Sequence, residues 1–233
     1  MIGAMALVMG LDGCRFGWVA VTTSADGRGL SSVSVIPDLA MVIERLDSGD
    51  LAAATIDIPI GLSDTWPRPV DVEARKLVGL RASSVFPTPL RAVLGSPDYQ
   101  SACERSFALC GKRMSKQAFA ITPKIEEVDK AMTPERQNRL VEIHPEVSFT
   151  VLAGRPMSFP KRTSEGRAER LAVLRSEFED LGDHVSVRVP GTAPDDVVDA
   201  FVAAWTARRW ANGAHVQLGG DLDSRGLRME MIA

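Results

Sequence analysis

Four aspartates occupy positions from which their carboxylates could act as one group. Asp12 follows an apolar segment directly, and Asp57 lies near the end of a second apolar segment. Asp196 and Asp199 have i, i+3 spacing, so they share one face of the helix expected there. Carboxylate oxygens suit hard cations such as Mg²⁺ or Mn²⁺. Two such ions, about 3.5–4 Å apart, can activate a water and stabilise the leaving oxygen of a phosphodiester, so the pattern predicts metal-dependent hydrolysis.

Structural roles could also account for some of these acids. The first two aspartates could each cap a turn, and acids in the first turn of a helix complement its dipole. Thr192 and Asp195 resemble a capping box at the start of the last helix. Asp199 lies a turn inside an otherwise apolar helix, where an ionised carboxylate is costly. This position favours a functional role for Asp199.

Strands are expected at the start of the chain. Residues 4–11 are continuously apolar, which is typical of a strand buried on both faces. Residues 18–23 predict a second strand, and residues 32–35, which alternate polar and apolar, predict a third. The connections between them are short and rich in glycine. Two short connections in succession predict an antiparallel meander.

A helix and a fourth strand follow. Asp38 is a suitable N-cap for a helix over residues 39–46, whose apolar side chains recur at i, i+3, i+4 and i+7. Residues 52–58 predict another buried strand, which ends at Pro59. A doubly wound nucleotide-binding fold would alternate strand and helix from the outset, so this order argues against that class.

The remaining elements are less regular. Prolines interrupt residues 59–138, and the helical patterns between them predict a partly helical region inserted beside the sheet. Residues 140–144 predict a short strand, residues 164–181 an amphipathic helix, and residues 194–210 the last long helix. We expect residues 1–233 to form a single domain.

The composition is that of an ordinary globular chain. Of its 233 residues, 45% are hydrophobic and 24% are charged, which excludes a disordered or fibrous protein. The formal net charge of −3 argues against a broad basic surface that grips nucleic acid without selectivity. Contacts with phosphates would have to come from a local patch.

The cysteines and the amino end bear on location. The chain has 3 cysteines and no CxxC pair, which argues against a disulfide framework or a thiolate zinc site. The apolar run at residues 4–9 is too short to span a membrane and lacks the basic flank of a signal peptide. We therefore expect a cytoplasmic protein with no membrane partner.

The order of the elements suggests a known architecture. Three strands, a helix and a strand, with acids on the first and fourth strands and on the final helix, are similar to the RNase H-like fold. The pair Asp196 and Asp199 also resembles the helix pair of Holliday-junction resolvases of that fold. We therefore predict an α/β fold, an RNase H-like mixed sheet of three antiparallel strands, a helix and parallel strands. Helices would flank the sheet, with a large insertion after the fourth strand.

A set of short motifs points to one family. The motifs occur in order at residues 10–15, 56–62, 83–89, 115–117, 123–125, 142–146 and 195–200. Together they resemble the domain-of-unknown-function-429 family, described as predicted nucleases of RNase H fold. The resemblance spans nearly the whole chain. It implies a nuclease that uses Mg²⁺ or Mn²⁺ and acts on a nucleic acid, either DNA or RNA.

The motif around residue 144 supplies further candidates. If the strand continued, Glu142, His144 and Glu146 would face one side. Glu142 or Glu146 could then be a further metal ligand, and His144 could shuttle a proton to the water or the leaving group. Alternatively, His144 and Glu146 hold the insertion against the sheet through hydrogen bonds. The sequence leaves both interpretations open.

Basic residues near the motifs are candidates for phosphate contacts, because Arg binds phosphate bidentately and Lys acts as a point charge. Arg15, Lys116 and Lys124 are the preferred candidates because they lie within or beside the motifs. Other basic residues close by are Arg91, Lys161 and Arg162.

Two other functions are compatible with the same residues. The fold unit also occurs in phosphotransferases of the actin and sugar-kinase type, in which the first-strand aspartate and glycines handle ATP phosphates. Those enzymes usually contain two copies of the unit, whereas this chain has no internal repeat. The acids could also form a structural metal site in a binding module without catalytic activity.

Overall fold

The computed structural model describes residues 6–65 and 67–233, which form a mixed sheet in the strand order β3-β2-β1-β4-β5. β2 pairs antiparallel with both β1 and β3, whereas β4 pairs parallel with both β1 and β5. The strands are β1 (Leu7–Cys14), β2 (Gly17–Ser24), β3 (Ser32–Ile36), β4 (Leu51–Ile56) and β5 (Leu140–Glu142). The predicted mixed α/β sheet is thus confirmed.

The strand predicted at residues 4–11 is shifted toward the carboxyl end. Residues 4 and 5 lie outside the described part of the chain, and β1 continues to Cys14. Asp12 is therefore a strand residue paired with Val19 of β2 rather than part of a turn. A tight hairpin from Cys14 to Gly17 explains the extension, because it lets pairing continue to the last residue.

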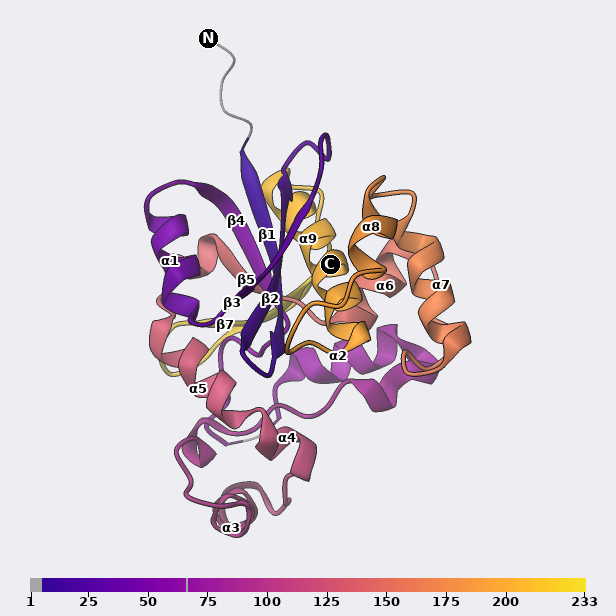
Figure 1. Ribbon diagram of the computed structural model, residues 1–233. Coiled ribbons are helices and arrows are strands. Elements are labelled where there is room, and N and C mark those ends of the chain that lie inside the picture. Colours follow the sequence, from indigo (N-terminus) through magenta and orange to yellow (C-terminus); the bar gives the residue numbers. More distant parts are fainter. Residues whose placement is uncertain (1–5, 66) are drawn as a thin grey trace.

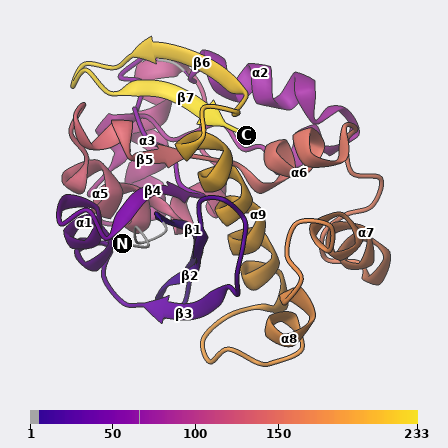
Figure 2. The same ribbon diagram turned by 90° about the horizontal axis from the view of Figure 1, so that it is seen from above.

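One face of the sheet is covered by α1 (Leu39–Asp47) and α5 (Thr122–Ala131) (Figure 2). The predicted N-cap is confirmed, because the Asp38 side chain accepts a hydrogen bond from Ala40 N at 2.8 Å. All the apolar residues that predicted this helix are buried: Leu39, Val42, Ile43 and Leu46.

The other face is covered by α9 (Pro194–Ala211), which packs directly against β1 (Figure 2). A Cβ atom at Gly10 would lie 2.0 Å from Ala204 N, so only glycine permits this approach. Outside α9 lie α6 (Pro145–Ala153), α7 (Ser164–Leu174) and α8 (Leu181–Val185).

Two helix predictions need correction. The helix predicted over residues 164–181 ends at Leu174, and a turn leads to the separate helix α8. Phe178 still reaches the core from that turn, which explains why its spacing suggested a longer helix. The strand predicted over 140–144 ends at Glu142, and Pro145 begins α6 instead of merely stopping the strand.

The segment between β4 and β5 is partly helical, as predicted for residues 59–138. α3 and α4 lie at the lower end of the molecule in Figure 1. The elements of this segment are α2 (Pro69–Leu77), η1 (Gly79–Ser84), η2 (Arg91–Val93), α3 (Tyr99–Cys110), α4 (Lys116–Ala120), α5 and η3 (Arg136–Asn138).

A hairpin of β6 (Gln217–Leu222) and β7 (Arg228–Ile232) ends the chain, and the sequence pattern did not predict it. It packs against α2, and β7 also contacts β5. Within residues 6–65 and 67–233, no helix has the length and apolar character needed to cross a membrane.

Candidate active site

Asp12 and Asp57 lie side by side at one edge of the sheet. The parallel pairing of β1 with β4 sets their positions, because Leu11 is opposite Ile56 and each acid is the next residue. The pairing continues one residue further, because Asp57 N donates to Leu11 O at 3.0 Å. The carboxyl ends of the two strands thus place both acids together, as the sequence predicted.

Asp199 is the third acid of this group and comes from α9. Its side chain is only 1% exposed, and neighbouring residues of α9 from Val197 to Ala207 are buried with it. The close packing of α9 on Gly10 brings this helix against the strand that carries Asp12. We call Asp12, Asp57 and Asp199 the carboxylate cluster.

Burial and mutual repulsion shape the titration of the cluster. Burial raises the pKa of Asp57 to about 8, and the charge of Asp199 adds to the shift. Burial also raises the pKa of Asp12 well above its usual range, and the charges of Asp57 and Asp199 raise it further. For Asp199, burial raises the pKa to about 6 although Lys161 opposes the shift. Each acid therefore resists ionisation unless a cation compensates it.

Asp196 has a different main contact. Its Oδ2 accepts a hydrogen bond from Ala193 N at 2.7 Å, so it closes the first turn of α9. The helix N-cap is Ala193, which corrects the expected pairing of Thr192 with Asp195 by one residue. Burial raises the pKa of Asp196 above its usual value. Asp196 lies near enough to Asp12 to raise the pKa of that residue slightly.

Lys161 supplies a cation to the cluster. Its Nζ lies 2.5 Å from Asp199 Oδ2 and 3.5 Å from Asp195 Oδ2. Burial disfavours the charge of Lys161, but the Asp199 carboxylate outweighs this effect and raises the pKa of the lysine above its ordinary value. The second oxygen of Asp199, Oδ1, is buried without a hydrogen-bond partner among the described residues.

Glu142 is held by an arginine. Arg68 Nη1 and Nη2 donate to Glu142 Oε2 and Oε1 at 2.6 and 2.7 Å, and Ile60 N donates to Oε2 at 2.7 Å. Arg68 is 1% exposed and also binds Asp71. Burial raises the pKa of Glu142 to about 7 against the opposing effect of Arg68. Both oxygens of the predicted metal ligand are thus engaged in a buried ion network.

His144 caps α6. Its Nδ1 accepts a hydrogen bond from Glu146 N at 3.2 Å, and Nε2 lies 3.3 Å from Ser84 O. Because a carbonyl only accepts, Nε2 carries the proton and the ring is neutral. Burial lowers the pKa of His144 to about 4. Glu146 forms a buried ion pair with Arg170. The contact of His144 with Ser84 joins β5 to the preceding helical segment, which favours the structural interpretation.

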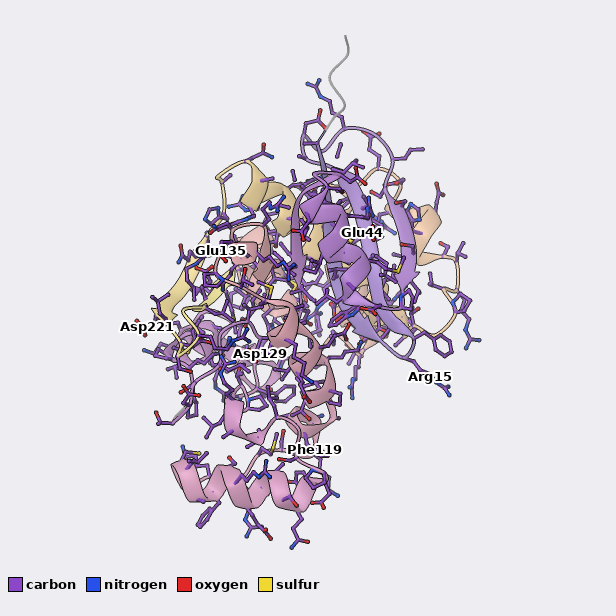
Figure 3. All side chains as sticks on the ribbon, turned by 90° about the vertical axis from the view of Figure 1, so that its left-hand side faces the viewer. Arg15, Glu44, Phe119, Asp129, Glu135 and Asp221 are labelled. Carbon is purple, nitrogen blue, oxygen red and sulfur yellow. The ribbon has the colours of Figure 1, made fainter. Side chains whose placement is uncertain are left out.

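The basic candidates separate into two groups. Lys124 lies beside the cluster, where its Nζ donates to Gly17 O at 2.6 Å and sits 4.0 Å from the centre of the Trp18 ring. Arg15 is exposed over the ring of Phe16, and its side chain points into solvent in Figure 3. Lys116 is exposed at the start of α4. Only Lys124 of the three lines the cavity described next.

A half-enclosed cavity of about 830 Å³ opens beside the cluster. Asp12, Asp57 and Lys161 form part of its wall, as do Lys124 and His144. Its other walls come from residues 81–89, 117–123 and 142–146. Asp12 and Asp57 thus face a space that a ligand can enter.

One comparison with known proteins is informative. Residues 10–223 match the model of the family described as "Protein of unknown function (DUF429)". This chain belongs to the DUF429 family. The match includes Asp12, Asp57 and Asp199 as well as the loop that carries Lys161. Comparisons with curated proteins and with solved structures gave no significant match.

The site of this DUF429 chain contains carboxylate oxygens from Asp12, Asp57 and Asp199, which are the type of donor that a hard cation prefers. Within the described residues, no three His, Cys, Asp or Glu side chains lie close enough to form a complete metal site. Oxygens without a partner are nevertheless present, since Asp199 Oδ1 accepts no hydrogen bond. Asp12 Oδ1 accepts one from the adjacent Gly13 N, at 2.8 Å. An all-oxygen donor set with spare acceptor capacity fits Mg²⁺ or Mn²⁺.

Two residues of this DUF429 site, Lys161 and Arg68, have contacts that local sequence patterns do not indicate. Lys161 was one of several basic residues near the motifs, and no local pattern showed that it would reach Asp199. Arg68 precedes Pro69 in a loop, where sequence gives no indication of burial. The i, i+3 spacing of Arg68 and Asp71 could have suggested their ion pair. Both contacts otherwise depend on tertiary packing.

Proposed function

We propose that this protein is a metal-dependent nuclease that hydrolyses phosphodiester bonds. The proposal rests mainly on one observation. Asp12, Asp57 and Asp199 converge from two strand ends and a helix, and burial and repulsion raise the pKa of all three. Asp12 and Asp57 also line one cavity. A cluster of this kind at the wall of an open cavity is more typical of a functional site than of a packing device.

The proposal extends to the fold. We assign the sheet to the RNase H-like architecture because its strand order is β3-β2-β1-β4-β5. In this order β1 pairs antiparallel with β2 and parallel with β4. The acids lie on the first strand, after the fourth strand and on the helix packed against the first. This distribution matches the arrangement that the sequence suggested.

The residues of the chain have distinct roles in this proposal. Asp12, Asp57 and Asp199 would hold Mg²⁺ or Mn²⁺. A bound ion would supply Lewis-acid chemistry at the phosphate and would favour ionisation of a water molecule. Before an ion binds, Lys161 balances the charge of Asp199. Lys124 lies in the cavity wall, where its charge would attract a phosphate. Neither lysine needs to exchange a proton for these roles.

Three predicted site residues take supporting roles in the proposal. Asp196 stabilises the first turn of the helix that carries Asp199. Glu142 and Arg68 fix the loop after β4, because Arg68 also donates to Ile60 O and Gly61 O at 3.1 and 3.2 Å. His144 starts α6 and contacts Ser84. Their contribution is to position the acids and the cavity wall.

A cleavage assay tests the proposal. The purified protein is incubated with Mn²⁺ or Mg²⁺ and labelled single strands, hybrids, duplexes and junctions. We expect cleavage of at least one substrate, and we expect Asp12→Asn to lower its rate by at least roughly a hundredfold. Asp50→Asn, an exposed acid outside the site, is the matched control and retains the wild-type rate. Ion binding without cleavage of any substrate would favour a non-catalytic metal site.

A further inference from the structure

The cavity beside the carboxylate cluster has an apolar side. Phe86, Pro87 and Pro89 line it from the loop after η1. Ile121 lines it from between α4 and α5, and Pro123 from the first turn of α5. Phe86 is 41% exposed, so part of this residue is accessible from the cavity side. Flat and apolar surfaces of this kind accept planar aromatic groups, which stack on rings and prolines at little cost.

Polar groups that can form hydrogen bonds with a planar heterocycle also line the cavity. Gln117 lines the cavity from the first turn of α4, and its side-chain amide offers both a donor and an acceptor. Ser83 lies on the neighbouring wall with its hydroxyl group. Such groups match the hydrogen-bonding edge of a nucleobase.

The charged side of the cavity suits a phosphate ester. Asp12 and Asp57 face it with the ion that the proposed function requires, and Lys124, Lys161 and Arg162 add positive charge. The net charge of −3 gives little support for contacts along an extended phosphate backbone. The basic residues of the cavity wall would therefore contact a phosphate locally.

We infer that the cavity binds one nucleotide unit, with its phosphate at the carboxylate cluster and its base between the apolar walls. This inference rests on the proposed function and specifies its substrate class. A volume of about 830 Å³ falls within the range of about 300–1,000 Å³ typical of small-ligand sites. The unit is either a free nucleoside monophosphate or the terminal nucleotide of a single strand. In both cases a continuous strand is not the preferred ligand.

Calorimetric titrations test the inference and separate the two sources. The protein with Mn²⁺ is titrated with nucleoside 5′-monophosphates, with a short linear single strand bearing cleavage-resistant phosphorothioate linkages, and with the same strand closed into a circle. We expect the linear strand or the monophosphates to bind at least roughly tenfold more tightly than the circle. Binding by the monophosphates identifies free nucleotides as a source, and binding by the linear strand alone identifies a chain end. Equal binding of circle and linear strand, without binding of monophosphates, would overturn the inference.

A pair of phenylalanine variants localises the base. Phe86→Ala should weaken binding by roughly tenfold, since stacking of one base on an aromatic ring has about this effect. Phe107→Ala is the matched control, because Phe107 is an exposed ring on α3 outside the cavity wall. An equal effect of both variants would contradict the assignment of the base. Nucleotide binding by a protein that cleaves none of the substrates with Mn²⁺ would retain this inference and refute the metal-dependent hydrolysis.

Discussion

Lys161 Nζ lies 2.5 Å from Asp199 Oδ2, so a loop lysine forms an ion pair with a buried acid of the central helix. The two partners differ in exposure, with 37% for Lys161 and 1% for Asp199. The ammonium group of Lys161 can move into solvent, whereas the carboxylate of Asp199 stays buried in the helix interface. A divalent ion at Asp199 would therefore meet Lys161 as its direct competitor.

This competition predicts the behaviour of Lys161→Ala. Without divalent ions, the variant should lose about 1–2 kcal/mol of the free energy of unfolding, because Asp199 keeps its burial and loses its partner. Added Mn²⁺ should stabilise the variant more than the wild type. Urea unfolding with and without Mn²⁺ measures both effects.

The matched control is Lys130→Ala. Lys130 pairs with Glu126 on the surface, where its side chain is 73% exposed. Its removal should change the free energy of unfolding by less than about 0.5 kcal/mol, with no dependence on Mn²⁺. If Lys161→Ala behaved like this control, the lysine would not be a competitor of the ion.

The raised pKa of Asp57 predicts a pH-dependent stabilisation by Asp57→Asn. The folded protein holds this proton up to about pH 8, whereas the unfolded chain releases it near the ordinary value of 3.8. The stability from this proton is fully present below pH 3.8 and is lost as the pH rises through 8. The neutral amide introduced by Asp57→Asn has no such proton to lose, so the free energy of unfolding of the variant does not fall in this way as the pH rises.

Asp57→Asn should thus match the wild type at acid pH and exceed its stability by about 1–3 kcal/mol at pH 8 in the absence of divalent ions. Urea unfolding in the presence of a chelator, repeated across this pH range, provides the measurement. A difference that does not vary with pH would show that the Asp57 proton does not couple to folding.

Ion binding should release protons. Because the pKa values of Asp199 and Asp57 are about 6 and about 8, an ion that binds at intermediate pH must displace protons from the cluster. The affinity for Mn²⁺ should therefore increase as the pH rises through this window. Calorimetry in buffers with different ionisation enthalpies counts the released protons. An affinity that is independent of pH would place the ion elsewhere.

Glu142→Gln separates a metal ligand from a structural acid. Arg68 would keep its burial and lose its carboxylate partner, so we expect a loss of about 3–5 kcal/mol in the free energy of unfolding. The folded fraction should bind Mn²⁺ with unchanged affinity, because both oxygens of Glu142 already face Arg68. A large loss of affinity for Mn²⁺ would show that Glu142 is a metal ligand.

Much of the fold was predictable because local patterns agree with tertiary packing. The helix after Asp38 buries the residues its spacing indicated, and the buried strands ending near Asp12 and Asp57 became neighbours in the sheet. The hairpin at residues 217–232 was not predicted. Its strands alternate only weakly in burial, and it gains its stability from α2.

The site was predictable only where backbone geometry sets it. Strand ends and a helix face brought Asp12, Asp57 and Asp199 together, and these positions follow from periodicity. The partners of Glu142 and Asp199 come from loops, at Arg68 and Lys161, whose paths no periodic pattern describes. Sequence could therefore identify the acids of the cluster but not their counter-charges.

The central claim is that the carboxylate cluster holds a divalent ion, and crystals grown with Mn²⁺ test it most directly. We predict an anomalous difference peak bounded by oxygens of Asp12, Asp57 and Asp199, with the Lys161 ammonium displaced from Asp199. The absence of any peak there, with Lys161 still bound to Asp199 at a saturating concentration of Mn²⁺, would contradict the account.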